Sequence, residues 1–235
     1  MKWSSRILTN MEWSGPISNR ADKEEVAREI ALKVKENDVI GIGSGSTCFL
    51  AIQAIGARIK AEGIKCTGIP TSAEVALACA SEGIPTTTLS QVRPDWSFDG
   101  ADEVDPARNL IKGRGGAMFR EKILISASGK TFILIDRSKL VSRLGEKFPI
   151  PIELAPEAVH IVEENLYGLG AVDVSLRLAV KKDGPVITEN GNFIFDTRFN
   201  TVEDSLEKEI KKITGVIESG LFLNYDVDLL IAGDK

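Results

Sequence analysis

The chain has few histidines and cysteines, which restricts its possible chemistry. His160 is the only histidine. It falls within an expected amphipathic helix, away from every glycine-rich loop, so a Ser-His-Asp triad or a histidine-rich metal site is not expected. Cys48, Cys66 and Cys79 are odd in number and form no CxxC pair. They make neither a disulfide framework nor a thiolate zinc site, and we interpret them as buried cytosolic thiols.

Long apolar runs and concentrated basic segments are also missing. No stretch approaches the ~20 apolar residues of a membrane-spanning helix. The first residues lack the apolar core of a secretory signal, which predicts a cytoplasmic protein without a membrane partner. Net charge is −5, and Lys and Arg are spread along the chain. Nucleic acid is therefore not expected as a partner, whereas a small anionic ligand needs only a local positive site.

The 235 residues suit one large domain or two small ones. We expect residues 1–19 to form an N-terminal extension, partly ordered by Trp3 and Trp13. From residue 22 to about 135, short apolar strands alternate with amphipathic helices. This order predicts an α/β, Rossmann-like domain with a parallel sheet.

The pattern changes near Phe148. The expected order from there is β-α-β-β-α-β, which predicts a smaller, ferredoxin-like α+β domain. A hairpin is expected where residues 186–188 and 193–199 flank Asn190–Gly191. The predicted domains are 20–147 plus 223–235 for the Rossmann-like part and 148–222 for the ferredoxin-like part, with residues 229–231 returning to the first sheet.

A glycine-rich loop, Gly41–Thr47, lies between an expected strand and an expected helix. Glycines let the backbone approach an anion, and a helix N-terminus offers free N–H groups. Ser46 stands where the dinucleotide fingerprint needs its last glycine, and no Walker-type Gly-Lys-Ser/Thr follows. The loop is either a phosphate cradle or a tight turn without a ligand.

Acidic residues follow the apolar strand expected near Trp96–Phe98, in the sequence DGADEVD. Carboxylates at the carboxyl end of a parallel strand lie where open α/β sheets bind ligands. They suit a divalent cation, the hydroxyls of a sugar, or only a solvated turn. Spacing alone does not decide among these.

Two further segments carry candidate catalytic charges. Lys112 lies in a glycine-rich segment and can supply charge to an oxyanion. Glu121 is in the first turn of a helix, where it can also serve only to complement the helix dipole. Lys139 follows an expected strand and either contacts a phosphate or is an ordinary surface lysine.

Together these segments resemble ribose-5-phosphate isomerase, type A. The resemblance is carried by GIGSGST, FDGADEVDP, LIKGRGGAMFREKI, DRSKLV, LGEKFPIPIE and ITENGNFIFD, and runs from about Lys23 to the C-terminus. It implies a Rossmann-like catalytic domain and a ferredoxin-like domain. It also implies an enzyme of the non-oxidative pentose phosphate pathway that interconverts D-ribose 5-phosphate and D-ribulose 5-phosphate, without metal or cofactor, as a homodimer or homotetramer.

The resemblance also assigns residues. Glu121 matches the general base, Asp99 and Asp102 the sugar-site aspartates, and Lys112 the active-site lysine. Asp99 would help to open the furanose ring. The expected substrate-binding residues are Ser44, Gly45, Ser46, Thr47, Gly100, Ala101, Gly113, Arg114, Gly115, Lys139 and Lys23. Arg114 stands where the family commonly has glycine, so the resemblance does not predict the backbone conformation beside Lys112.

Two other functions compete with the isomerase. A non-catalytic sugar-phosphate sensor on a related fold would keep the phosphate loop but need neither Glu121 nor Lys112. A nucleotide-dependent enzyme is disfavoured by the missing nucleotide-binding patterns.

Overall fold

The computed structural model describes residues 12–233, which form two compact units. The first unit comprises the chain up to Gly100, the segment Ile123–Arg137 and the residues from Asp226 on; the second comprises Ala101–Lys122 and Ser138–Tyr225. Most of the expected extension, residues 1–11 with Trp3, lies outside the described residues. Trp13 is described, and its ring packs 5.6 Å from that of Phe49.

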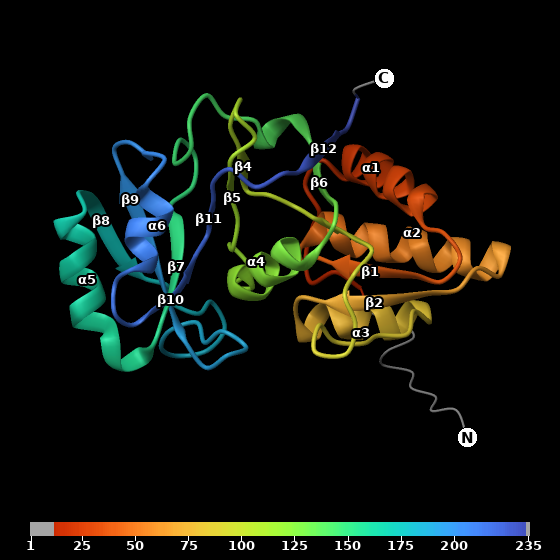
Figure 1. Cartoon of the computed structure of the whole chain (residues 1–235), viewed down its shortest axis with the longest axis horizontal. Helices are drawn as coiled ribbons and strands as arrows, with labels where there is room; N and C mark the ends of the chain where they lie inside the picture. Colours follow the sequence, from red (N-terminus) through yellow and green to blue (C-terminus); the bar gives the residue numbers. More distant parts are fainter. Residues whose placement is uncertain (1–11, 234–235) are drawn as a thin grey trace. The chain divides into compact units, whose positions relative to one another are not determined.

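A five-stranded parallel sheet organises the first unit (Figure 1). Its order is β12-β6-β3-β1-β2. The strands are β1 (Asp38–Ile42), β2 (Cys66–Pro70), β3 (Trp96–Asp99), β6 (Thr131–Ile135) and β12 (Asp228–Ile231). All neighbouring pairs run parallel. The predicted Rossmann-like class and the return of residues 229–231 to this sheet are confirmed.

Helices cover both faces of this sheet. On one face α2 (Ser46–Glu62) packs against α1 (Arg20–Lys33) and α3 (Ala73–Glu82). Ile40 and Ile42 belong to the apolar core formed with these helices. Gly41 points to the opposite face, because side chains alternate along a strand. A Cβ added there would lie 2.9 Å from the side chain of Leu124, in α4 (Met118–Ala127).

The residues that cap α1 and α3 are not those with capping-box spacing in the sequence, which are Asp22 with Glu25 and Thr71 with Glu74. Helix α3 is capped by Ser72, whose Oγ accepts a hydrogen bond from Val75 N, and not by Thr71. Helix α1 begins at Arg20 without a side-chain cap on its N-cap residue, Asn19. The amide of Asn19 donates instead to Asp136 Oδ1, 3.0 Å away.

Residues 86–89, between α3 and β3, contribute only one bridge to the first sheet, from Thr86 to Gly68. The chain turns directly afterwards, because the N–H groups of Gln91 and Val92 donate to Thr88 O. One residue of pairing is too short to add a strand to the sheet.

An antiparallel sheet with the order β10-β7-β9-β8 organises the second unit. Its strands are β7 (Ile150–Leu154), β8 (Ala171–Leu176), β9 (Phe193–Phe199) and β10 (Val216–Ser219). Helix α5 (Val159–Gly168), which follows the 3-10 turn η3 (Pro156–Ala158), and helix α6 (Leu206–Lys211) bury Val162, Leu166, Leu206 and Ile210 against its strands. The predicted β-α-β-β-α-β order is confirmed.

The expected hairpin within this sheet is only partly present. The N–H of Thr188 donates to Asn192 O and the N–H of Gly191 donates to Thr188 O, which closes a turn around Asn190–Gly191, but residues 186–188 form no strand. The strand that precedes β9 in the chain and pairs with it is β8, with residues 177–192 between them.

A small antiparallel sheet was not foreseen. It consists of β4 (Glu103–Val104), β5 (Leu110–Ile111) and β11 (Leu221–Phe222), in the order β11-β5-β4. Two-residue strands show no hydrophobic period, so the sequence gives no sign of them. Residues 101–122 and 138–147 belong to the second unit. The predicted domain bounds place these residues with the first sheet, and those bounds stay a prediction.

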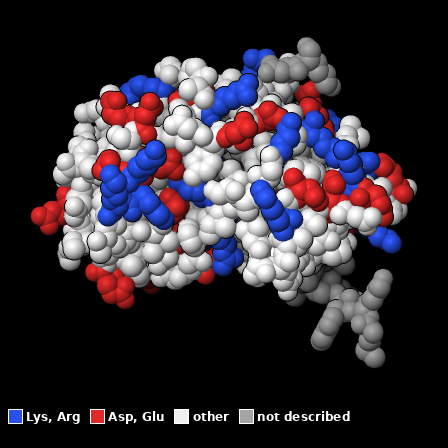
Figure 2. Space-filling view, viewed as in Figure 1, with Lys and Arg blue, Asp and Glu red and all other residues white. Residues whose placement is uncertain are grey.

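Charged residues of the two signs are mixed on the surface shown in Figure 2, and the described helices are not long and apolar. Lys and Arg lie interspersed with Asp and Glu on the face shown in Figure 2. Over residues 12–233, none of the helices combines the length and hydropathy needed to span a bilayer.

Candidate active site

In the sheet of the first unit, the chain adds strands on opposite sides of β1. From β1 the chain crosses to β2 on one side, whereas β3 and β6 lie on the other. In open parallel sheets, ligands bind outside the carboxyl ends of the strands at such a point. The segments that leave β1 and β3 there are Gly43–Thr47 and Asp99–Gly100. They are joined by a 2.8 Å hydrogen bond from Gly43 N to Phe98 O.

The Gly43–Thr47 segment leads directly into the first turn of α2. Gly45, with φ of 96°, is the N-cap, and α2 begins at Ser46. The Lys23 ammonium group lies 3.2 Å from Ser46 Oγ, and its side chain is buried. A helix N-terminus, hydroxyl groups and a buried ammonium group together form a site suited to a phosphate.

Asp99 is 2% exposed and packs directly on this loop. A Cβ at Gly43 would lie 2.1 Å from Asp99 Cγ, so only glycine fits there. Asp99 Oδ1 accepts the N–H of Gly100 at 2.7 Å and lies 3.8 Å from Cys48 Sγ. A buried carboxylate thus stands beside the candidate phosphate site.

Asp136 is a carboxylate that the sequence analysis did not assign to the site. It comes directly after β6, at the same edge of the sheet, and is 1% exposed. Its bond to Asn19 ties this edge to the start of α1, the helix that carries Lys23. The rule that singled out Asp99, an acidic residue directly after an apolar strand, also applies to Asp136.

In the second unit, Glu121 and Lys112 form a buried ion pair. Lys112 Nζ lies 3.3 Å from Glu121 Oε2, and the side chains are 3% and 4% exposed. Lys112 follows β5, and Glu121 lies in the first turn of α4. The ammonium group compensates the buried negative charge of the carboxylate, whose desolvation would otherwise be costly. The pair places a proton acceptor beside a fixed positive charge.

The ring of Phe222 supports this pair. Phe222 is fully buried in β11, and its centre lies 5.8 Å from Lys112 Nζ and 4.7 Å from Lys122 Nζ. Lys122 also donates to Leu221 O at 2.6 Å and to the carboxylates of Glu207 and Glu218. This charged cluster fixes the first turn of α4, where Glu121 lies.

Glu218 titrates abnormally because of this cluster. Burial is the largest single influence and opposes its ionisation. The charge of Lys122, the Ser219 N–H and the hydrogen bonds from Lys122 and Lys211 act in the opposite direction and outweigh burial in sum. Together they hold the pKa of the Glu218 carboxyl below its usual value.

The segment after Lys112 is a glycine-rich turn that contacts Asp102. Gly113 has φ of 94°, and a Cβ there would lie 2.8 Å from Met118 Cβ, so glycine is required twice over. The turn is closed by a hydrogen bond from Gly116 N to Gly113 O. The N–H of Arg114 donates to Asp102 Oδ2 at 3.1 Å.

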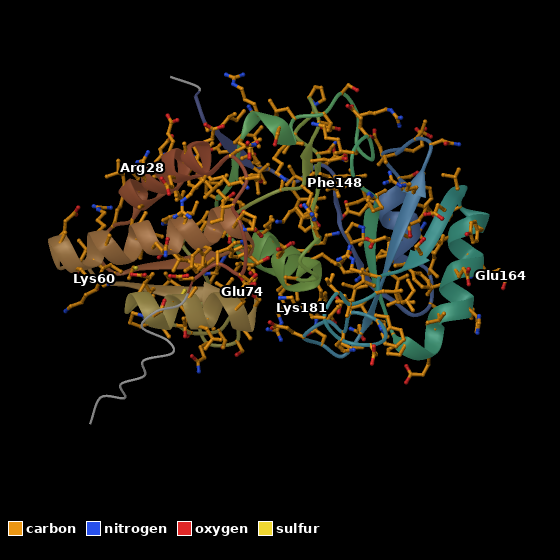
Figure 3. All side chains as sticks on the ribbon, turned by 180° about the vertical axis from the view of Figure 1, so that it is seen from behind. Arg28, Lys60, Glu74, Phe148, Glu164 and Lys181 are labelled. Carbon is orange, nitrogen blue, oxygen red and sulfur yellow. The ribbon has the colours of Figure 1, made fainter. Side chains whose placement is uncertain are left out.

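Arg114 and Lys139 share one aromatic ring. The guanidinium carbon of Arg114 and the Lys139 ammonium nitrogen lie 5.4 and 5.6 Å from the centre of Phe148, which is labelled in Figure 3. Glu103, fully buried, holds this segment through the N–H groups of Gly145, Lys147 and Phe148. The ring of Phe148 was not recognised as a site feature in the sequence.

The four acidic residues of the DGADEVD segment therefore have different roles. Asp99 lies by the phosphate loop, and Asp102 holds the glycine-rich turn. Glu103 is structural, and Asp105 closes a turn by accepting from Asn109 N and Nδ2. Among residues 12–233, no three His, Cys, Asp or Glu side chains are placed to hold a metal ion.

The predicted residues thus gather in two groups, one in each unit. In the first unit, Lys23, the Ser44–Thr47 loop, Asp99 and Gly100 lie at the carboxyl edge of the sheet. In the second unit, Lys112, Glu121, Asp102 and the Gly113–Gly115 turn are joined by the contacts described above. Ala101 begins the second unit, directly after Gly100.

The three cysteines are free and buried, as expected. Burial raises the pKa of the Cys66 thiol to about 11, helped by Asp38 and Glu36. It raises that of Cys79 to about 12, helped by Cys66. Neither Cys66 nor Cys79 is therefore an activated thiolate.

A family model and several known proteins match most of this chain. The family model described as ribose 5-phosphate isomerase A (phosphoriboisomerase A) matches residues 67–235. The ribose-5-phosphate isomerase A of Thermosynechococcus vestitus is 45% identical over 216 residues, which cover 90% of this chain and 91% of that protein. That of Pyrococcus abyssi is 45% identical over 222 residues, covering 92% and 96%.

Solved structures agree. Ribose 5-phosphate isomerase A from Methanocaldococcus jannaschii has a TM-score of 0.89 at 44% identity, covering 92% of this chain and 96% of that chain. A D-ribose-5-phosphate isomerase in complex with phospho-erythronic acid has a TM-score of 0.88 at 41% identity, with the same coverage. The chain therefore belongs to the ribose 5-phosphate isomerase A family.

Proposed function

We propose that the protein interconverts D-ribose 5-phosphate and D-ribulose 5-phosphate through an enediolate, with Glu121 as the base that moves the proton. The observation that carries this proposal is the buried Lys112–Glu121 pair, in which a carboxylate is held 3.3 Å from an ammonium group. A sugar phosphate as substrate is supported by the relative solved in complex with phospho-erythronic acid.

The reaction begins with ring opening. Asp99 accepts the proton of the O1 hydroxyl as the bond between C1 and the ring oxygen breaks, and then passes this proton to the ring oxygen, which becomes a hydroxyl. The product is an open-chain aldehyde. The burial of Asp99 against Gly43 keeps its carboxylate in one position, which favours this step.

Isomerisation follows. Glu121 removes the proton from C2, the C1–C2 double bond forms, and negative charge develops on O1. Lys112 and Asp102 hold this oxygen, with Lys112 supplying the compensating charge. Glu121 then returns the proton to C1, while the O2 hydroxyl proton moves to O1 and the carbonyl forms at C2. One carboxylate therefore serves both carbons.

The phosphate is bound away from the reacting carbons. Lys23 and the Ser44–Thr47 loop contact it, and the binding free energy gained there orients C1 and C2. Lys139 and Arg114 add positive charge, while Gly100, Ala101, Gly113 and Gly115 offer backbone groups to the sugar.

We also propose a cytoplasmic, metal-independent homodimer or homotetramer. The support is the family resemblance and the three free, buried thiols. Light scattering on the purified protein gives the oligomeric state. Turnover that persists in excess EDTA supports metal independence, and a strict requirement for added Mg²⁺ or Mn²⁺ would contradict it.

The function is tested by following ribulose 5-phosphate formation from ribose 5-phosphate, for the wild type and for Glu121→Gln. Glutamine keeps the shape but is not a base, so kcat is expected to fall by about 10²–10⁴-fold while ribose 5-phosphate still binds. A wild type that binds the sugar phosphate without converting it would instead indicate a sensor. Near-normal turnover by Glu121→Gln would remove Glu121 from the mechanism.

A further inference from the structure

Arg177 reaches the glycine-rich turn from a position 65 residues further along the chain than Lys112. It follows β8, and its Nη1 donates to Gly113 O at 3.0 Å and to Arg114 O at 2.9 Å. Its Nε donates to Asp196 Oδ2 at 2.8 Å, and its Nη2 forms an ion pair with Asp196 Oδ1. The guanidinium group is thus bound on one edge by a carboxylate and on another by two carbonyls.

These carbonyls belong to two consecutive peptide groups. The first contains Gly113 O and Arg114 N, and that N–H donates to Asp102 Oδ2. Because a peptide group is planar, fixing its oxygen also fixes the direction of its N–H. Arg177 and Asp102 therefore hold the same peptide from its two ends. The second contains Arg114 O and Gly115 N, so Arg177 also sets the direction of the Gly115 N–H.

The turn needs such a constraint. Gly113 and Gly116 both have positive φ, and glycine has the largest backbone freedom of any residue. Within the second unit, Lys112 at the start of the turn is held by a hydrogen bond from its N–H to Gly220 O at 2.9 Å. The rigid fork of an arginine can hold the following carbonyls while paired to a carboxylate, which a lysine cannot do.

We propose that Arg177, oriented by Asp196, is a positioning residue for the reaction. It acts through the Gly113–Gly115 backbone and fixes Asp102 relative to Lys112. This inference rests on the proposed function. It predicts that loss of Arg177 disturbs the geometry of the chemical step more than it weakens substrate binding.

Arg58 provides a matched control. Its Nη1 donates to Ala31 O and Val34 O at 2.8 and 2.7 Å, and its Nε pairs with Glu62. Arg58, like Arg177, joins a carboxylate to two backbone carbonyls, but these carbonyls lie at the end of α1 in the first unit, and only its Nε contacts the carboxylate. Arg58→Met and Arg177→Met therefore remove comparable contacts, and only the second removes contacts to the turn.

The test compares kcat, KM and the thermal melting temperature for the wild type, Arg58→Met, Arg177→Met and Arg177→Lys. Both methionine variants are expected to melt at lower temperatures. Arg177→Met should lose about 10–100-fold in kcat, because small misplacements of catalytic groups have effects of this size, with a much smaller change in KM. Arg177→Lys should regain thermal stability but little of the kcat. Arg58→Met should keep the wild-type kcat.

A double variant tests the coupling. If Arg177 acts through Asp102, Arg177→Met should lower kcat less in an Asp102→Asn background than in the wild type. Wild-type kcat in a folded Arg177→Met protein, or full additivity with Asp102→Asn, would overturn the positioning role alone. A wild type without isomerase activity would overturn the proposed function together with it.

Discussion

The two glycine-rich loops of the chain are held in place in different ways. Gly43–Thr47 is fixed by its immediate surroundings: β1 before it, α2 after it, and Asp99 packed on Gly43. The turn after Lys112 is fixed by polar groups distant in sequence, among them Gly220 and Arg177. The first loop depends on close packing and the second on hydrogen bonds and charge, so the two should respond differently to substitution and to pH.

Among substitutions that test how the two loops are held, the largest effect is expected from Gly43→Ala. The added methyl group would lie 2.1 Å from Asp99 Cγ, so either the carboxylate or the loop must move. We expect a loss of about 1–3 kcal/mol in the free energy of unfolding. The same change should lower kcat/KM by about a hundredfold, since the groups move relative to the substrate.

Denaturant melts and initial rates measure these effects. Gly129→Ala is the control, because its added Cβ would meet nothing closer than Asp95 O at 3.5 Å. An unaffected Gly43→Ala variant would show that the first loop is not held by close packing.

A smaller, pH-dependent effect is expected from Glu218→Gln. The pKa of this carboxyl is lowered in the folded protein, so its stabilisation is present above the unfolded pKa of ~4.3 and is lost as pH falls through the folded value. At neutral pH the variant should be about 1–3 kcal/mol less stable, and the difference should shrink in acid.

Urea melts between pH 7 and pH 3 measure this difference. Glu164, exposed on α5, provides the control variant Glu164→Gln, which should match the wild type throughout (Figure 3). If the difference in unfolding free energy between the wild type and Glu218→Gln stays constant from pH 7 to pH 3, ionisation of the Glu218 carboxyl contributes no stability.

The smallest effect is expected from Arg114→Gly. The contacts of Arg114 to Asp102 and Arg177 use its backbone N–H and C=O, which glycine retains. Only the exposed contact with Phe148 is lost, worth about 0.5–1 kcal/mol. We expect kcat within about threefold of the wild type. A tenfold or greater change in kcat would assign the Arg114 side chain a direct role towards the sugar.

The first loop could be predicted from sequence, and much of the support of the second could not. A strand, a glycine-rich loop and a helix are consecutive, so the Gly43–Thr47 site follows from local pattern and the parallel-sheet rule. Asp136 follows from the same rule and was overlooked. Lys112 and Glu121 could be named, but their ion pair depends on the three-dimensional fold.

Contacts between residues distant in sequence account for the remaining features that the sequence did not predict. Arg177 and Phe222 lie 65 and 110 positions from Lys112, and no periodicity links them to it. The two-residue strands that bring Phe222 beside Lys112 are too short to be recognised. The start of α1 also depends on a long-range contact, because Asn19 bonds to the distant Asp136.

The most direct test of the mechanism follows the proton itself. Ribose 5-phosphate is incubated in D₂O with wild type or Glu121→Gln, and NMR measures conversion and solvent deuterium at C1 and C2, with binding checked by thermal shift. The account predicts conversion by the wild type, with deuterium entering to the extent that the protonated Glu121 carboxyl exchanges with solvent before it returns the proton. It predicts neither conversion nor exchange by a Glu121→Gln protein that still binds the substrate. Conversion or exchange by Glu121→Gln at near the wild-type rate would contradict Glu121 as the base.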